Sequence, residues 1–249
     1  MVNVFLANEG NKTTKVKKVY STSTQKRLSQ LKHTSWSTLG SSNLHLIVQT
    51  PNGEDENDWV ALHITDFYNE LVILGEMATT SDDAEKFSAA GKGFPPGMIY
   101  KWREGKGKKP QTVSGPEYVN YTLAYVDGVV NNPAVFPQTD EDKFPEDFID
   151  VAKDLYVKLF RVFAILYGAF LESLKAMDVS QHLNTSFKHY VYFGICHSLM
   201  PPEKELTPLK TKVKQFTDQY HEALKKTAAS KPKAAKSLQP MTIEESMQI

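Results

Sequence analysis

One stretch of the chain is apolar on nearly every side of a predicted helix. It runs from Phe148 to Leu174, with the sequence FIDVAKDLYVKLFRVFAILYGAFLESL. A helix of this kind is buried, with other helices packed around it. The uninterrupted apolar run, Val162 to Leu171, is too short for a membrane span, and a buried strand would be shorter and bounded by turn residues. We therefore predict the core helix of a helical domain, with Lys158 and Arg161 as its two cationic residues. These two either pair with a local acid such as Asp154 or bind an anionic group such as a phosphorylated peptide.

A second long helix is predicted from roughly Asp55 to Gly75. Apolar residues at helical spacing define its core face: Val60, Ile64, Phe67, Leu71 and Leu74. A separate row at i, i+4 spacing contains Glu54, Asp58, Leu62 and Asp66, with Trp59 beside it. This row is either a solvated acidic face with Trp59 turned partly inward, or an electrostatic docking surface with an aromatic anchor.

The other segments predict shorter elements. MIYKW (98–102) and QTVSG (111–115) read as a β-hairpin, and residues 76–97 as a loop. A helix is expected at about Pro116 to Val130, with a face of Tyr118, Tyr121, Tyr125 and Val129. Another is expected at HLNTSFKHYVYFGICHSL, with Asn184 or Thr185 as N-cap, and a last one from about Leu206 to Lys226.

The distribution of charge is more informative than its sum, which is zero in this chain of 249 residues. Seven lysines or arginines and no acid lie between Lys12 and Lys32. Between His33 and Glu85 there is no lysine or arginine, while ten acids accumulate. This acidic block indicates a basic protein segment as partner, rather than nucleic acid. We expect residues 1–30 to be a basic flexible segment, 31–226 the domain, and 227–249 a disordered tail.

Specific catalytic and nucleotide-binding motifs are absent from the sequence. His182 and His189 fall near one helical face but lack a third ligand, so they make a poor metal site. The single cysteine, Cys196, excludes an internal disulfide, and no charged n-region precedes a long apolar run at the N-terminus. We read Cys196 as a packed residue and expect a cytoplasmic location, with the nucleus or division structures as further sites.

Several segments together resemble the Mob (Mps-one-binder) family of kinase activators. They are TLGSSNL (38–44), GEDENDWVALHITDFYNEL (53–71), YKW (100–102), FPEDFIDVAKDLYVKLFRVFAILY (144–167) and HLNTSFKHYVYF (182–193). HLNTSFKH is similar to the group that binds NDR/LATS kinases, rather than to the phocein-like group. The resemblance implies an all-α fold around a four-helix bundle with a small hairpin. It also implies a protein without enzymatic activity, and for this chain we expect a monomer without a cofactor.

The resemblance also implies functional positions. The family's kinase-docking surface falls on Glu54, Asp58, Trp59, Asp66 and His189. Of its phosphopeptide site, Lys158 and Arg161 match two basic residues, the third falls on Val157, and a further lysine aligns near Thr139. Two threonines regulated by phosphorylation align with Thr13 and Thr38.

The largest departure from the family concerns zinc. The family's two cysteine ligands fall near Asp82 and Phe87, and its two histidine ligands on Ile165 and Phe170. None of these four positions has the cysteine or histidine that the family has there. We therefore predict that no zinc is bound, and that apolar packing of Ile165 and Phe170 replaces the metal link between the loop and the core helix.

The resulting hypothesis is an adaptor or co-activator in Hippo-type or mitotic-exit signalling. It would bind the basic N-terminal regulatory region of an NDR/LATS-family kinase. An upstream Hippo-type kinase or a phosphorylated scaffold is a further expected partner. One alternative is a scaffold or phosphopeptide-binding protein that no longer activates a kinase. A hydrolase that uses the retained histidines is disfavoured, since no histidine lies beside a plausible nucleophile in the sequence.

Overall fold

The computed structural model describes residues 43–105, 107–139 and 142–230. This part of the chain is mostly helical, with one small antiparallel sheet, so the predicted all-α class is confirmed. Its elements are α2 (Leu44–Ile47), α3 (Glu56–Thr79), α4 (Asp82–Lys86), β1 (Lys101–Trp102), β2 (Gln111–Thr112), α5 (Gly115–Val130), α6 (Phe148–Ala169), α7 (Leu171–Ala176), α8 (Ser180–Cys196), α9 (Glu203–Leu206), a 3₁₀ turn (Thr207–Leu209) and α10 (Lys210–Ser230).

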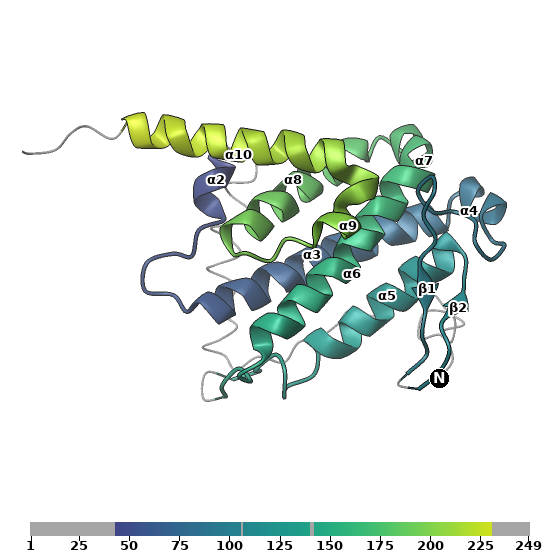
Figure 1. Ribbon diagram of the computed structural model, residues 1–249, viewed down its shortest axis with the longest axis horizontal. Coiled ribbons are helices and arrows are strands. Elements are labelled where there is room, and N and C mark those ends of the chain that lie inside the picture. Colours follow the sequence, from purple (N-terminus) through teal and green to yellow (C-terminus); the bar gives the residue numbers. More distant parts are fainter. Residues whose placement is uncertain (1–42, 106, 140–141, 231–249) are drawn as a thin grey trace, which may run out of the picture.

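The predicted core helix, α6, lies at the centre of a bundle with α3, α5 and α8 (Figure 1). Its side chains Leu155, Leu159 and Phe163 are fully buried. α10 runs across α8 on one side, and the hairpin lies against α5 on the other. None of the helices in the described ranges is both long and apolar enough to cross a membrane.

Local sequence signals explain where the main helices begin. The Asp55 carboxylate accepts hydrogen bonds from the backbone N–H groups of Asn57 and Asp58, at 2.8 and 3.3 Å, and so caps α3. Ser114 and Glu117 form a reciprocal capping box at the start of α5, where a proline occupies the first turn. The five predicted core positions of α3 are all buried, which confirms that face.

Several predicted bounds are wrong. The core helix ends at Ala169, because Phe170 leaves helical geometry before α7 begins. Part of the expected loop 76–97 is helical, since α3 continues to Thr79 and α4 follows. α8 begins at Ser180, so Asn184 and Thr185 lie inside the helix and neither is its N-cap. α10 begins at Lys210, after the proline of the 3₁₀ turn, and continues past the expected end at 226.

The hairpin and the face of α5 differ from prediction in extent. The hairpin pairs Lys101 with Thr112 and Trp102 with Gln111, and its strands have two residues each. On α5, Tyr118 is buried as expected, but Tyr125 is exposed. The helix instead buries a neighbouring row against the bundle, with Val119, Thr122, Leu123, Val126 and Val130.

Candidate functional site

The acidic row of α3 is longer than the sequence suggested. Glu54 precedes the helix, and Asp58 and Asp66 follow it along one face. Glu70 continues the row by one more i+4 step, and Ser186 of α8 donates its hydroxyl to the Glu70 carboxylate. Burial raises the pKa of Glu70, and the charge of Asp66 adds to that rise. Sequence reasoning missed Glu70, although continuing the same spacing would have found it.

Trp59 lies beneath this row rather than on it. Its side chain is 1% exposed, and its indole Nε1 donates to the backbone carbonyl of Val48 at 3.1 Å. An exposed aromatic anchor therefore does not fit this conformation, and the alternative of an inward-turned Trp59 describes it better. The indole has its polar atom satisfied and its ring in the core, so it supports the start of α3.

His189 is also buried, at 2% exposure, and faces α3. Its ring lies 5.3 Å from that of His63 and 4.9 Å from that of Phe67, centroid to centroid. His63 Nδ1 donates to the carbonyl of Trp59 at 3.0 Å. Neither ring nitrogen of His189 has a hydrogen-bond partner within the described ranges, and burial lowers the pKa of His189 to about 4. A direct surface contact through His189 does not fit this burial. Its contribution to binding, as a support for α3, stays a prediction.

A histidine, His197, fixes the start of α3 to the end of α8. His197 Nε2 donates to the Val48 carbonyl at 2.8 Å, and Nδ1 lies 3.2 Å from a carboxylate oxygen of Glu56. Both partners are acceptors, so the protonated ring can donate to each of them. Burial opposes that charge, but hydrogen bonds to Cys196, Val48 and Glu56 raise the pKa of His197. The Val48 carbonyl thus accepts from both Trp59 and His197, which fixes the geometry of this end.

The motif HLNTSFKH links α8 to its neighbours. The amide oxygen of Asn184 accepts from the Tyr167 hydroxyl at 2.8 Å and from the Lys212 ammonium at 3.2 Å. Asn184 thereby connects α8 to α6 and α10, while Ser186 connects it to α3. Leu183 and Phe187 are fully buried. The motif is therefore mainly a set of packing and hydrogen-bonding positions in the bundle.

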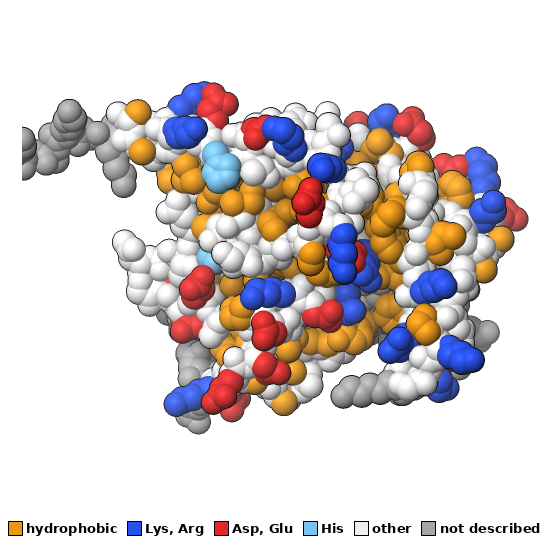
Figure 2. Space-filling model, viewed as in Figure 1, with side chains coloured by type: hydrophobic (Ala, Val, Ile, Leu, Met, Phe, Trp, Pro, Cys, Tyr) orange, Lys and Arg blue, Asp and Glu red, His pale blue; other side chains and the backbone are white. Residues whose placement is uncertain are grey.

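The cationic residues of α6 both have partners. Lys158 lies 3.5 Å from an Asp154 carboxylate oxygen and over the ring of Tyr125, so its expected local pairing is confirmed. Arg161 donates to both carboxylate oxygens of Glu205, on α9. Figure 2 shows acidic side chains gathered over the first turns of α3 and α6, and basic ones over the hairpin.

At three of the four positions that correspond to the family's zinc ligands, Phe87, Ile165 and Phe170, the side chains pack as apolar groups. Phe87 and Phe170 meet edge to face with ring centroids 5.5 Å apart, and Ile165 is fully buried. The predicted apolar link between the loop and the core helix is therefore confirmed for Phe170. These three side chains have no donor atom for a metal, so zinc does not fit this set. Across the described residues, no group of three or more His, Cys, Asp or Glu side chains could hold a metal ion.

Comparison with known proteins shows the family of this chain. The model of the Mob1/phocein family matches residues 36–209. The chain is 35% identical over 221 residues to "MOB kinase activator-like 1 homolog B" of Dictyostelium discoideum, covering 87% of this chain and 98% of that protein. It is 35% identical over 187 residues to "MOB kinase activator-like 1A" of Arabidopsis thaliana (74% and 84%), and 34% over 213 residues to "MOB kinase activator 3A" of Mus musculus (84% and 96%). The chain belongs to the Mob1/phocein family.

In this Mob chain, the residues suggested by the resemblance separate into two groups. Glu54 precedes α3, and Asp58 and Asp66 lie on it, Asp66 buried at 9% exposure; Trp59 and His189 pack beneath that row. Lys158 and Arg161 lie on α6, where α5 and α9 supply their neighbours. Thr13 and Thr38 lie outside the described residues, as do segment 1–30 and most of the tail.

Proposed function

We propose that this protein is a non-catalytic adaptor that activates a protein kinase of the NDR/LATS family by binding its basic N-terminal regulatory region. Membership in the Mob1/phocein family supports a kinase-activating adaptor, since the relatives are named kinase activators. The choice of an NDR/LATS kinase, and a role in Hippo-type or mitotic-exit signalling, rest on the HLNTSFKH resemblance. We place the protein in the cytoplasm, with the nucleus or division structures as further sites.

The observation that best supports docking is the acidic row of α3. Its carboxylates extend from Glu54 to Glu70 on one face, inside a stretch in which His33 to Glu85 contains no lysine or arginine. A basic helix laid along this face would meet the partly exposed carboxylates of Glu54 and Asp58, whereas Asp66 is buried, at 9% exposure, and Glu70 is partly buried. Such complementarity mainly raises the association rate and makes it sensitive to salt.

A rigid support lies beneath this face. Trp59 and His197 converge on the Val48 carbonyl, and His189 and His63 fill the space between α3 and α8. A surface that is already fixed in this way loses little conformational entropy when a partner binds. For the same reason, removing Trp59 would test stability more than recognition.

Charge reversal on α3 tests the proposal. We would measure binding of the basic N-terminal segment of an NDR-family kinase from the same organism, at low and high salt, by surface plasmon resonance. The double variant Glu54→Lys with Asp58→Lys should lose at least tenfold in affinity, mostly through a slower association. Glu76→Lys makes the same kind of change on an exposed part of α3 outside the row and should bind normally.

Unchanged affinity in a folded double variant would contradict docking on α3. A separate assay measures the activity of the kinase, with its N-terminal segment present, in the presence and absence of this protein. This assay distinguishes activation of the kinase from binding alone. Binding without stimulation would favour the scaffold alternative.

A second candidate function, binding of a phosphorylated peptide, is supported by the side chains around α6. Lys158 and Arg161 lie nearly one turn apart, and each keeps about a quarter of its side chain accessible, at 22% and 26%. Tyrosine rings border both cations. Titration with a phosphothreonine peptide and its unphosphorylated counterpart tests this candidate, which fails if the two bind equally.

A further inference from the structure

Arg161 is held by a carboxylate in the geometry that a phosphate group would adopt. Its Nε and Nη2 atoms donate to the two Glu205 oxygens at 2.9 and 2.8 Å, and Nη1 donates to the Tyr118 hydroxyl at 3.1 Å. The same guanidinium fork binds carboxylate and phosphate in a bidentate manner. Glu205 is therefore placed where an anionic ligand of Arg161 would lie.

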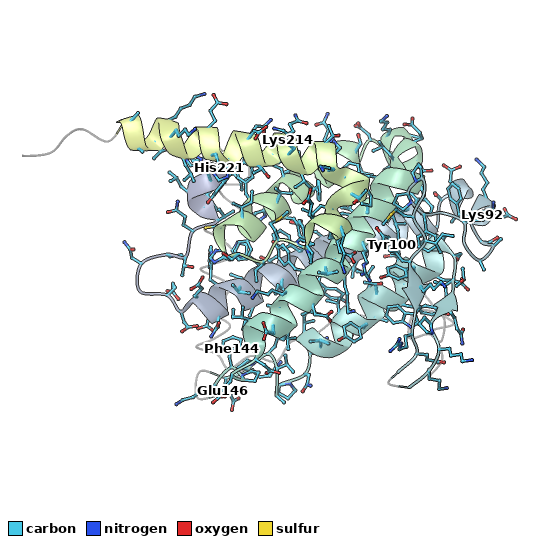
Figure 3. All side chains as sticks on the ribbon, in the orientation of Figure 1. Lys92, Tyr100, Phe144, Glu146, Lys214 and His221 are labelled. Atoms are coloured by element: carbon cyan, nitrogen blue, oxygen red, sulfur yellow. The ribbon has the colours of Figure 1, made fainter. Side chains whose placement is uncertain are left out.

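Tyr100 supplies a second observation at the same place. Its side chain is 6% exposed, and its hydroxyl has no hydrogen-bond partner among the described residues. The Arg161 guanidinium lies 5.4 Å from the centre of its ring, and Figure 3 shows Tyr100 between α9 and the hairpin. A buried hydroxyl without a partner is unfavourable, so a ligand with additional acceptor oxygens would gain a bond that Glu205 does not make. Burial raises the pKa of Tyr100, which keeps the hydroxyl a neutral donor.

We propose that Arg161, Tyr118 and Tyr100 form a pocket for the phosphate of a phosphopeptide, and that Glu205 closes this pocket as an internal competitor. The ligand binds by displacing the Glu205 carboxylate from Arg161. Tyr100 then donates to a third phosphate oxygen, which a carboxylate, with its two oxygens, does not have. This inference rests on the second candidate function above and describes the regulation of that same site.

The element that holds Glu205 can move at low cost. α9 has four residues, none of them buried, between Pro202 and the 3₁₀ turn. Leu206 is partly buried against the core and is its main apolar contact. Since the bridge is partly solvent-accessible, at 26% and 16% for the two side chains, a stronger anion can compete for it.

Charge balance explains why the pocket is closed at rest. Glu205 neutralises Arg161, and Asp154 lies beside Lys158, so the four side chains have no net charge. Hydrogen bonds from Arg161 lower the pKa of Glu205, so the competitor stays ionised at neutral pH. A phosphate monoester has up to two negative charges and three acceptor oxygens, which favours exchange.

The experiment is an NMR titration of the full chain with N-acetyl-phosphothreonine amide and, in parallel, its unphosphorylated form. The chain has three arginines, so the Nε–H resonance of Arg161 can be assigned by substitution. Glu205→Gln should bind the phosphorylated probe at least tenfold more tightly than wild type. Glu203→Gln is the matched control, because Glu203 lies on the same helix and pairs with Lys210 instead.

Two further variants in the Glu205→Gln background identify the pocket. Arg161→Ala should abolish the gain. Tyr100→Phe should remove part of it without lowering thermal stability, because the lost hydroxyl has no partner in the closed state. Equal affinity of wild type and Glu205→Gln, or a gain that persists without Arg161, would overturn the proposal.

If Glu205→Gln does not fold, Glu205→Asp keeps the charge but shortens the reach, and a smaller gain in the same direction is expected of it. Both substitutions leave α3 unchanged, so binding of the basic kinase segment should be normal in each. Phosphorylation-dependent binding that is equal in wild type and Glu205→Gln would overturn the closed pocket alone, whereas equal binding of the phosphorylated and unphosphorylated probes to every variant would also overturn the second candidate function.

Discussion

Tyr156 of α6 and Tyr190 of α8 each donate their hydroxyl to the other's backbone carbonyl, at 2.9 and 2.7 Å. Their rings stack with centroids 4.2 Å apart and planes at 17°. Both are fully buried, and burial raises the pKa of each phenol well above its usual value. The pair therefore joins two bundle helices through neutral hydrogen bonds in a water-excluded place.

Removing either hydroxyl should weaken the bundle. Tyr156→Phe or Tyr190→Phe each loses one buried hydrogen bond, which costs about 1–2 kcal/mol in free energy of unfolding. Urea unfolding followed by circular dichroism measures this. The double variant should lose less than the sum, because the two bonds share one stacked pair. Tyr121→Phe, at a half-buried residue on α5, is the control and should be neutral. Full additivity would mean that the bonds act independently.

The buried histidines predict a loss of stability in acid. His189 has its pKa lowered to about 4 by burial, and the pKa of His63 is also lowered, by burial and by His189. Between that value and the ordinary 6.5, the unfolded chain binds protons that the folded chain does not. Stability from His189 is therefore complete above pH 6.5 and falls by about 1.4 kcal/mol per pH unit below it.

Other groups titrate in the same range, so the test compares variants. The raised pKa values of His197 and Glu70 act in the opposite direction, since in each case the folded chain keeps its proton longer. His189→Leu should reduce the pH slope of the unfolding free energy between pH 6.5 and 5.5, relative to wild type. An identical slope in the two proteins would show that the pKa of His189 is not lowered in the folded state.

The periodic parts of the fold could be read from the sequence, and the long-range contacts could not. The core face of α3 and the identity of α6 follow from helical spacing, which is a local property. The burial of Trp59 depends on a carbonyl at Val48, outside the helix, so spacing alone placed it beside the acids. Arg161 and Glu205 are 44 residues apart, and nothing in the α6 pattern indicates that partner.

Two glycines in the bundle should respond oppositely to alanine. A Cβ atom at Gly168 of α6 would lie 2.7 Å from Pro95 Cα, so Gly168→Ala must push the loop away. We expect it to destabilise the protein by about 1–3 kcal/mol. Gly128 of α5 has open space around its Cβ position, and alanine there should stabilise by about 0.5–1 kcal/mol. Thermal unfolding of the two variants measures these changes in stability. Equal effects of the two substitutions would mean that Pro95 does not pack closely against Gly168 of α6.

The contact of Phe87 with Phe170 predicts a protein that is stable without zinc. The two rings are 5.5 Å apart in edge-to-face geometry, at positions where the family has metal ligands. Chelation with EDTA should therefore leave the thermal midpoint unchanged, and elemental analysis should find no stoichiometric zinc. Phe170→Ala should lower the free energy of unfolding by about 3–5 kcal/mol, because Phe170 is fully buried and its removal leaves a cavity next to Phe87. A fall in the midpoint on chelation, or one zinc per chain, would show that metal and not aromatic packing joins the loop to α6.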